Sequence, residues 1–152
     1  MWPEDRGILG QWCSWGVQPF AANVNSWYWG HGRLGPYSLV WFDIIGADGN
    51  EYVSGYASLD GEVIASSCSG IKVRPTGVNS QYPPVIGSGS PGGFYIELDL
   101  ADGNVLEVNV TTALVVVDAG SYSRFTGSLS GGVKGSTIYQ GVALYEEFAF
   151  TE

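Results

Sequence analysis

One histidine, two cysteines and a few isolated cations are the residues of this 152-residue chain whose side chains could do catalytic chemistry. His31 is the sole imidazole, so a serine-type triad or a zinc cluster would have to be built around a single ring. Cys13 and Cys68 fit no metal-ligand spacing, and we expect both to be reduced packing residues. The sequence therefore predicts neither a metal site nor a cofactor.

The cations allow a different chemistry, the binding of an acidic group. Lys134 lies in the glycine-rich turn 130–135, where its ammonium could face an acidic enol or enolate, and an ordinary solvated lysine is the alternative. Arg33 could serve in the same way or pair with Asp43 or another carboxylate. His31, between two glycines, could donate a hydrogen bond to a substrate carbonyl or only hydrogen-bond within its loop.

Aromatic residues are concentrated early, and nine fall within 31 residues. They are Trp12, Trp15, Phe20, Trp27, Tyr28, Trp29, Tyr37, Trp41 and Phe42. Such a cluster offers wide apolar walls with a few indole and phenol donors, as small-molecule sites do, although aromatic residues fill barrel cores equally well.

The elements that must position these residues are strands, because from residue 38 onward apolar residues alternate with polar ones. Strands are predicted at 38–47, 51–58, 62–67, 71–74, 94–101, 106–116, 122–129 and 137–150, with Asp-Gly turns after 47, 59 and 101. Adjacent acids Glu146 and Glu147 then point to opposite faces of a strand and form no acid–base pair. We predict an all-β fold, an antiparallel lipocalin-like β-barrel of about eight strands, with a β-sandwich as the alternative.

The chain is expected to form one domain over residues 1–152, with residues 1–36 as an aromatic-rich leading segment and 76–93 as a long loop. Six basic residues against 15 acidic ones give a net charge of −9, which argues against nucleic acid and anionic membranes as partners. No apolar run is long enough to cross a bilayer, and no export signal is recognisable, so a cytoplasmic location is expected.

Five segments in order carry a family resemblance. They are WGVQPF at 15–20, SWYWGHGRLGPYSLVWFD at 26–43, IKVRPTG at 71–77, FTGSL at 125–129 and GVALYEEF at 141–148. The set resembles the C-terminal half of the fungal Diels-Alderases that form decalin rings, and more remotely carotenoid 1,2-hydratase (hydroxyneurosporene synthase). The resemblance implies a two-domain parent whose N-terminal β-sandwich domain is absent from this chain, with substrate held between the domains or at the barrel mouth.

The function that the resemblance implies is a cofactor-independent pericyclase, which folds a linear polyene of polyketide origin for intramolecular [4+2] cycloaddition. A cycloaddition needs no proton shuttle, so confinement in a hollow lined by aromatic rings would supply most of the acceleration. The expected walls are Trp15, Trp27, Trp29, Trp41 and Phe125, and the expected polar anchors are Lys134, His31 and Tyr37. The substrate would be an apolar polyene with an acidic enol head.

Two alternatives stay open. A non-catalytic lipocalin-like module would bind an apolar small molecule, an N-terminal β-sandwich domain or a second copy of the chain, since the stretch 12–15 (WCSW) departs from the family pattern. A terpenoid double-bond hydratase would need a proton donor, for which His31 or Asp43 is available without any sign in the sequence that either is tuned.

Overall fold

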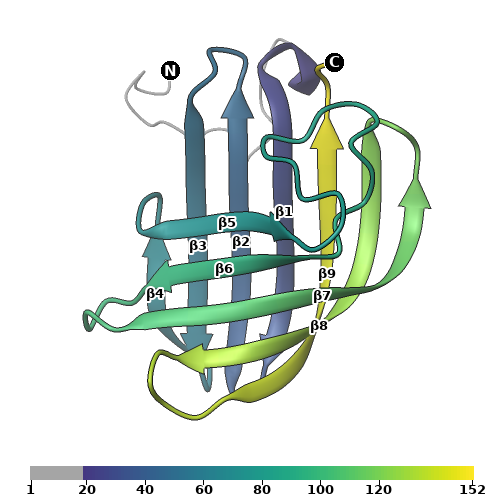
Figure 1. Ribbon diagram of the computed structural model, residues 1–152. Helices are drawn as coiled ribbons and strands as arrows, with labels where there is room; N and C mark the ends of the chain where they lie inside the picture. Colours follow the sequence, from purple (N-terminus) through teal and green to yellow (C-terminus); the bar gives the residue numbers. More distant parts are fainter. Residues whose placement is uncertain (1–18) are drawn as a thin grey trace.

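The computed structural model describes residues 19–152, in which a short 3-10 helix, η2 (Phe20–Ala22), leads into nine strands. The strands are β1 (Val24–Leu34), β2 (Tyr37–Gly46), β3 (Glu51–Leu59), β4 (Glu62–Ser67), β5 (Ile71–Thr76), β6 (Gly93–Asp99), β7 (Val105–Asp118), β8 (Tyr122–Val133) and β9 (Tyr139–Ala149). They form one antiparallel sheet in the order β4-β3-β2-β1-β9-β8-β7-β6-β5 (Figure 1). The all-β antiparallel prediction is confirmed.

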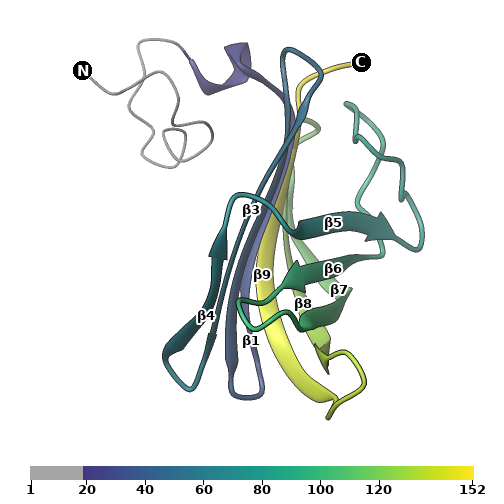
Figure 2. The ribbon, with the colours of Figure 1, turned by 90° about the vertical axis from the view of Figure 1, so that its left-hand side faces the viewer.

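The sheet curls into a nearly closed barrel, in which β5, β6 and β7 cross over the face of β1, β2 and β3 at a steep angle (Figures 1 and 2). The outer strands β4 and β5 do not pair with each other. The Ala101 amide, in the β6–β7 turn, donates to the Ile64 carbonyl of β4 at 3.0 Å and links the two halves of the sheet there. The lipocalin-like barrel is therefore the observed architecture, with nine strands instead of about eight.

The ninth strand is β1, which lies inside the aromatic-rich leading segment, where no strand was predicted. It occupies a central position, paired along its length with both β2 and β9. Its alternation is hidden because aromatic rings occupy both faces and the inward positions Gly30 and Gly32 carry no side chain. A Cβ at Gly30 would lie 2.3 Å from the Trp41 ring, so glycine is required where the strand passes this indole.

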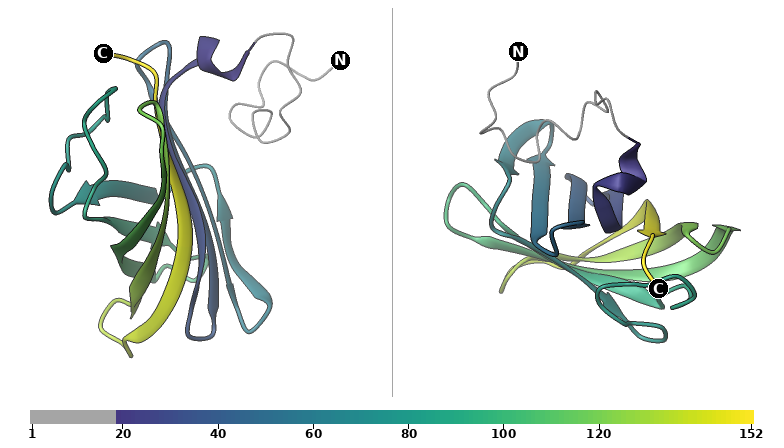
Figure 3. Two further views of the ribbon diagram at one scale, coloured as in Figure 1. Left: turned by 90° about the vertical axis from the view of Figure 1, so that its right-hand side faces the viewer. Right: turned by 90° about the horizontal axis from the view of Figure 1, so that it is seen from above.

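The turn predictions agree with the structure. Asp60 and Gly61, between β3 and β4, both have positive φ (50° and 88°), the geometry of the tight hairpin turns that favour Asp-Gly. The long loop expected at 76–93 is confirmed as residues 77–92, between β5 and β6. It lies beside the C-terminal end of the chain (Figure 3), where the Ile86 amide donates to the Thr151 carbonyl at 2.7 Å.

Around Trp41 and Phe125 the barrel interior is filled by its own side chains, whereas a pocket of about 220 Å³ lies at the end near Tyr37 and Leu100. Trp41, Tyr145, Phe94 and Phe125 are among the largest fully buried residues, and the Phe94 and Phe125 rings lie 5.5 and 5.3 Å from that of Tyr145. The gap beside Trp41 measures about 10 Å³, room for no more than one water molecule. Trp41 and Phe125, which were expected to line a hollow, are both core residues in this structure.

Cys68 is exposed, so its prediction as a packing residue is wrong, whereas Cys13 lies outside the described residues.

Within residues 19–152 there is no helix of the length and apolar character needed to span a membrane.

Candidate functional site

Four inward-facing polar residues form one row across the sheet at the end of the barrel where the chain terminates. The register pairs Ser123 with Glu147, Glu147 with Tyr28, and Tyr28 with Asp43 across β8, β9, β1 and β2. We call these four the acid row. All are buried, and neighbouring strands lie about 4.8 Å apart, so the carboxyl groups of Asp43 and Glu147 flank the Tyr28 side chain.

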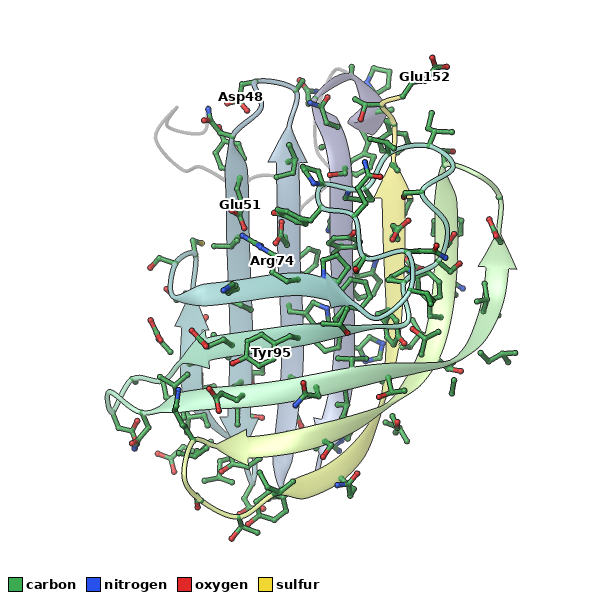
Figure 4. All side chains as sticks on the ribbon, viewed as in Figure 1. Asp48, Glu51, Arg74, Tyr95 and Glu152 are labelled. Carbon is green, nitrogen blue, oxygen red and sulfur yellow. The ribbon has the colours of Figure 1, made fainter. Side chains whose placement is uncertain are left out.

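Asp43 is the best-connected member of the acid row. Its carboxylate accepts hydrogen bonds from the Tyr82 hydroxyl at 2.9 Å and from Arg74 Nη1 at 3.0 Å. The Arg74 guanidinium stacks over the Tyr82 ring at 4.1 Å and also pairs with Glu51, at 2.8 and 3.1 Å. Figure 4 shows Arg74 and Glu51 reaching toward each other from β5 and β3. Two strands and a loop thus hold Asp43 in place.

The two carboxyl groups of the row bind protons more tightly than ordinary acids. Burial raises the pKa of Asp43 to about 7, and the charge of Glu51 adds to this against the opposing effects of the Tyr82 hydrogen bond and Arg74. Burial, with a smaller effect of the Asp118 charge, raises the pKa of Glu147 to about 7. Each group therefore exists in protonated and ionised forms at neutral pH, as a general acid must.

The phenol groups nearby stay protonated, so they can donate hydrogen bonds but do not give up a proton. Burial first, and then the charges of Glu147 and Asp43, raise the pKa of Tyr28 far above its usual range, and burial with the charge of Asp43 does the same for Tyr82. The Tyr82 ring, in loop 77–92, stacks on the Tyr28 ring at 6.3 Å. Loop 77–92 is therefore the segment that borders the acid row on the inward side.

The outward face of the same strands is aromatic. Phe20 of η2 packs on Trp27 at 4.6 Å, and a stack runs from Trp27 through Phe42 and Trp29 to His31, with ring centres 5.5, 5.7 and 5.8 Å apart. The Trp27 indole nitrogen is buried with no hydrogen-bond partner among residues 19–152. This face combines apolar rings with an unused donor.

The pKa of Glu146, on the outward face, is shifted in the opposite direction to that of its neighbour Glu147. Its carboxylate accepts hydrogen bonds from the Trp29 indole, from the Tyr122 hydroxyl at 2.7 Å and from Arg124 Nε at 2.7 Å. Burial would raise the pKa of Glu146, but the hydrogen bonds from these three residues hold it below its usual range. The two adjacent acids face opposite sides as predicted, one kept ionised and the other often protonated.

Next to the aromatic stack lies an open groove of about 910 Å³ on the outward face of β1, β2, β8 and β9. We call this hollow the outer groove. Polar and apolar side chains both line it, among them His31, Arg33, Ser38, Val40, Val142 and Leu144. Arg33 donates to the Ser38 hydroxyl at 2.7 Å and does not pair with Asp43, whose partner is Arg74.

The predicted site residues do not converge on one place. Trp27, Trp29 and His31 come together on the outward face, whereas Tyr37 is buried in the interior beside the Tyr139 ring at 5.8 Å. Lys134 is 67% exposed and pairs with Glu107 at 3.1 Å, and it does not line the outer groove. Trp41 and Phe125 are core, and Trp15 lies outside the described residues.

Sequence reasoning missed most of the acid row. Asp43 entered only as an untuned donor or a surface partner for Arg33, while Tyr28 was assigned to the aromatic cluster and Glu147 was given no role. A usable signal existed, since strand alternation places Glu147 on the same face as Tyr145, and an acid at an inward position needs an explanation. Tyr82 and Arg74 come from distant segments and carried no such signal.

The most informative likenesses are to fungal proteins. The chain is 41% identical over 139 residues to the quinolone epoxide rearrangement protein penF of Penicillium thymicola, and 42% identical over 139 residues to the quinolone epoxide rearrangement protein asqO of Emericella nidulans. Each match covers 90% of this chain but 38% of the relative. Neither relative is a carotenoid hydratase by description, so that remote resemblance gains no support.

Solved structures show the same fold. CghA matches with a TM-score of 0.70 at 11% identity, covering 88% of this chain and 42% of CghA. CghA with Sch210972 matches with a TM-score of 0.67 at 12% identity, covering 86% of this chain and 42% of that one. No protein-family model matches the sequence.

Proposed function

We propose that this chain is the barrel part of an enzyme of fungal secondary metabolism that rearranges an apolar small molecule by donating a proton, without a cofactor. The observation that carries the proposal is the acid row, in which Asp43 and Glu147 hold protons near neutral pH beside the Tyr28 phenol. Epoxide opening is the reaction we favour, because the two relatives are described as epoxide rearrangement proteins.

The chemistry needs one donor that can also take the proton back. The neutral Asp43 carboxyl gives its proton to the epoxide oxygen while one C–O bond breaks, with the electron pair remaining on oxygen. A group migrates to the carbocation formed, the hydroxyl-bearing carbon becomes a carbonyl, and the released proton returns to Asp43. In the interval Arg74 and Tyr82 stabilise the Asp43 carboxylate through the bonds they already make. The net reaction is an isomerisation.

A second candidate is the [4+2] cycloaddition of a linear polyene. It is supported by the open groove beside an aromatic stack and by the resemblance to decalin-forming Diels-Alderases. Such a reaction gains from orientation, within an upper range of about 7–11 kcal/mol, and has no use for a carboxyl with a raised pKa. Its rate would be insensitive to replacement of Asp43.

The chain spans 38% of the length of its two relatives, so a partner that covers the site is part of this proposal. We propose an N-terminal β-sandwich domain or a second copy of the chain as the covering partner. The outward aromatic rings, of which Phe20 is 40% exposed, offer such a partner a contact surface. Without it, the non-catalytic binding module is the function that remains.

The test compares Asp43→Asn with Glu51→Gln, which removes a neighbouring carboxylate that is partly exposed. Each variant is incubated with a quinolone epoxide and, separately, with a linear polyene, alone and with the N-terminal part of penF, and products are separated by chromatography. We expect Asp43→Asn to lower epoxide turnover about 10²- to 10⁴-fold, the usual contribution of a general acid. The protein without substitutions should lose activity as the pH rises through about 7, because Asp43 then loses its proton.

Full epoxide turnover by a folded Asp43→Asn variant would refute the proton-donor role. Conversion of the polyene alone, insensitive to Asp43, would establish the cycloaddition. If neither substrate reacts with or without the N-terminal part, the chain is a binding module. Circular dichroism and thermal unfolding of each variant separate loss of function from loss of fold.

A further inference from the structure

We propose that the outer groove is a second binding site, on the outside of the barrel, for an amphipathic organic anion with a carboxylate or enolate head and an apolar body. Its volume, about 910 Å³, falls within the range of small-molecule sites. The groove and the acid row lie on opposite faces of the same strands, so this inference does not depend on the proton-donor role of Asp43.

The positive charge of Arg33 is the reason for proposing a ligand with an anionic head group. Of the five basic residues in the described part of the chain, Arg74, Arg124 and Lys134 pair with carboxylates, whereas Arg33 and Lys72 do not. Arg33 has no carboxylate partner among residues 19–152, although the chain carries 15 acidic and six basic residues. Arg33 uses one guanidinium nitrogen on the Ser38 hydroxyl and retains its other donors for a bidentate contact with an anion.

The apolar body is specified by the floor of the groove. The register places Val40 and Leu144 on either side of His31, and Ser38 and Val142 on either side of Arg33. Val142 is 68% exposed and Leu144 is half-buried, so a ligand lying along β1 would cover apolar surface that now faces solvent.

The far end of the groove is aromatic. The His31 ring lines the groove and stacks on the Trp29 ring at 5.8 Å and 23°. Trp29 lies four positions before Arg33, which is about 13 Å along a strand. A ligand with its head on Arg33 therefore has length for an extended apolar or conjugated body before it meets the indole, whose donor is already held by Glu146.

The probe is cis-parinaric acid, a conjugated tetraene carboxylate whose fluorescence increases in apolar surroundings, with its methyl ester as the uncharged counterpart. We expect the acid to bind more tightly than the ester, and Arg33→Gln to weaken binding of the acid about tenfold with little effect on the ester. Val142→Glu, at an exposed position that tolerates the change, should weaken both. The matched control is Lys72→Gln, which removes an unpaired cation from β5 and should change neither.

Three results would overturn the proposal: no binding of either probe, equal effects of Arg33→Gln and Lys72→Gln, or binding untouched by Val142→Glu. Asp43→Asn distinguishes binding in the outer groove from the proposed reaction, because this variant should bind cis-parinaric acid as tightly as the original protein does. Energy transfer from tryptophan to the bound tetraene, reduced by Trp29→Phe, locates the body of the probe next to the aromatic end.

Discussion

Replacing Glu147 by Gln should make the protein more stable at alkaline pH and leave it unchanged at acidic pH. Gln is close in shape to a protonated glutamic acid and cannot ionise. The pKa of Glu147 in the folded protein is about 7, against 4.5 for an ordinary glutamate, because burial disfavours its charge. The unfolded chain therefore loses this proton at a lower pH than the folded protein does.

The sign and the size follow from that difference. Below about pH 4.5 both states are protonated and Glu147 does not affect the free energy of unfolding. Between about pH 4.5 and 7 only the unfolded state ionises, so stability falls as pH rises, and above about 7 the loss is complete. At 1.36 kcal/mol for each pKa unit, the full loss is about 3 kcal/mol, which Glu147→Gln would recover.

The assay is urea unfolding at pH 4.5 and 8.5, followed by tryptophan fluorescence. Glu146→Gln is the matched control on the adjacent residue, and its effect should have the opposite sign. It removes an ionised acceptor of Trp29, Tyr122 and Arg124, and we expect it to lower stability at pH 8.5 by about 1–2 kcal/mol. A Glu147→Gln protein that is no more stable than the original at pH 8.5, or equally stabilised at both pH values, would refute the assignment.

Three shorter predictions concern other parts of the fold. Gly30→Ala should lower the free energy of unfolding by about 1–3 kcal/mol in chemical denaturation, because the added Cβ would lie 2.3 Å from the Trp41 ring, and an unchanged midpoint would contradict the close packing. Tyr82→Phe removes a hydrogen bond that lowers the pKa of Asp43, so the alkaline limb of the activity profile should move to higher pH and thermal stability should fall by about 1 kcal/mol. Lys134→Gln should change the unfolding midpoint and the product yield little, since its ion pair is exposed, and a large loss of turnover would return Lys134 to the site.

The strands that the sequence predicted well are those with one polar and one apolar face. β7, with Leu106, Val108 and Val110 inward, needs nothing beyond alternation, and the Asp-Gly pairs mark its hairpin and those of β2 to β4. β1 was missed because its outward residues include Trp27 and Trp29 while its inward glycines contribute no hydrophobic signal. The alternation of polar and apolar residues does not reveal a strand whose outward face also carries aromatic side chains.

The candidate site was less predictable for a different reason. Whether Trp41 lines a cavity or fills it depends on how closely the far wall approaches, and that distance is set by β6 and β7, many residues away. The pairing of Tyr28 with Glu147 joins two residues more than 100 positions apart, so it requires the sheet order and not only the strands. The local sequence pattern predicts on which side of its strand a residue lies, but not which residues of other strands contact it.

The central position of β1 also limits how chains of this kind can vary in length. Tyr28, a member of the acid row, faces inward while Trp29, His31 and Arg33 face outward, so inserting or deleting one residue in β1 would exchange the two sets and place an arginine in the core. The register with β2 and the register with β9 would be lost together, because both strands pair with residues 26–34 of β1. Length differences among related chains should therefore gather in loop 77–92 and the β8–β9 turn, and the spacing from Tyr28 to Asp43 should stay constant.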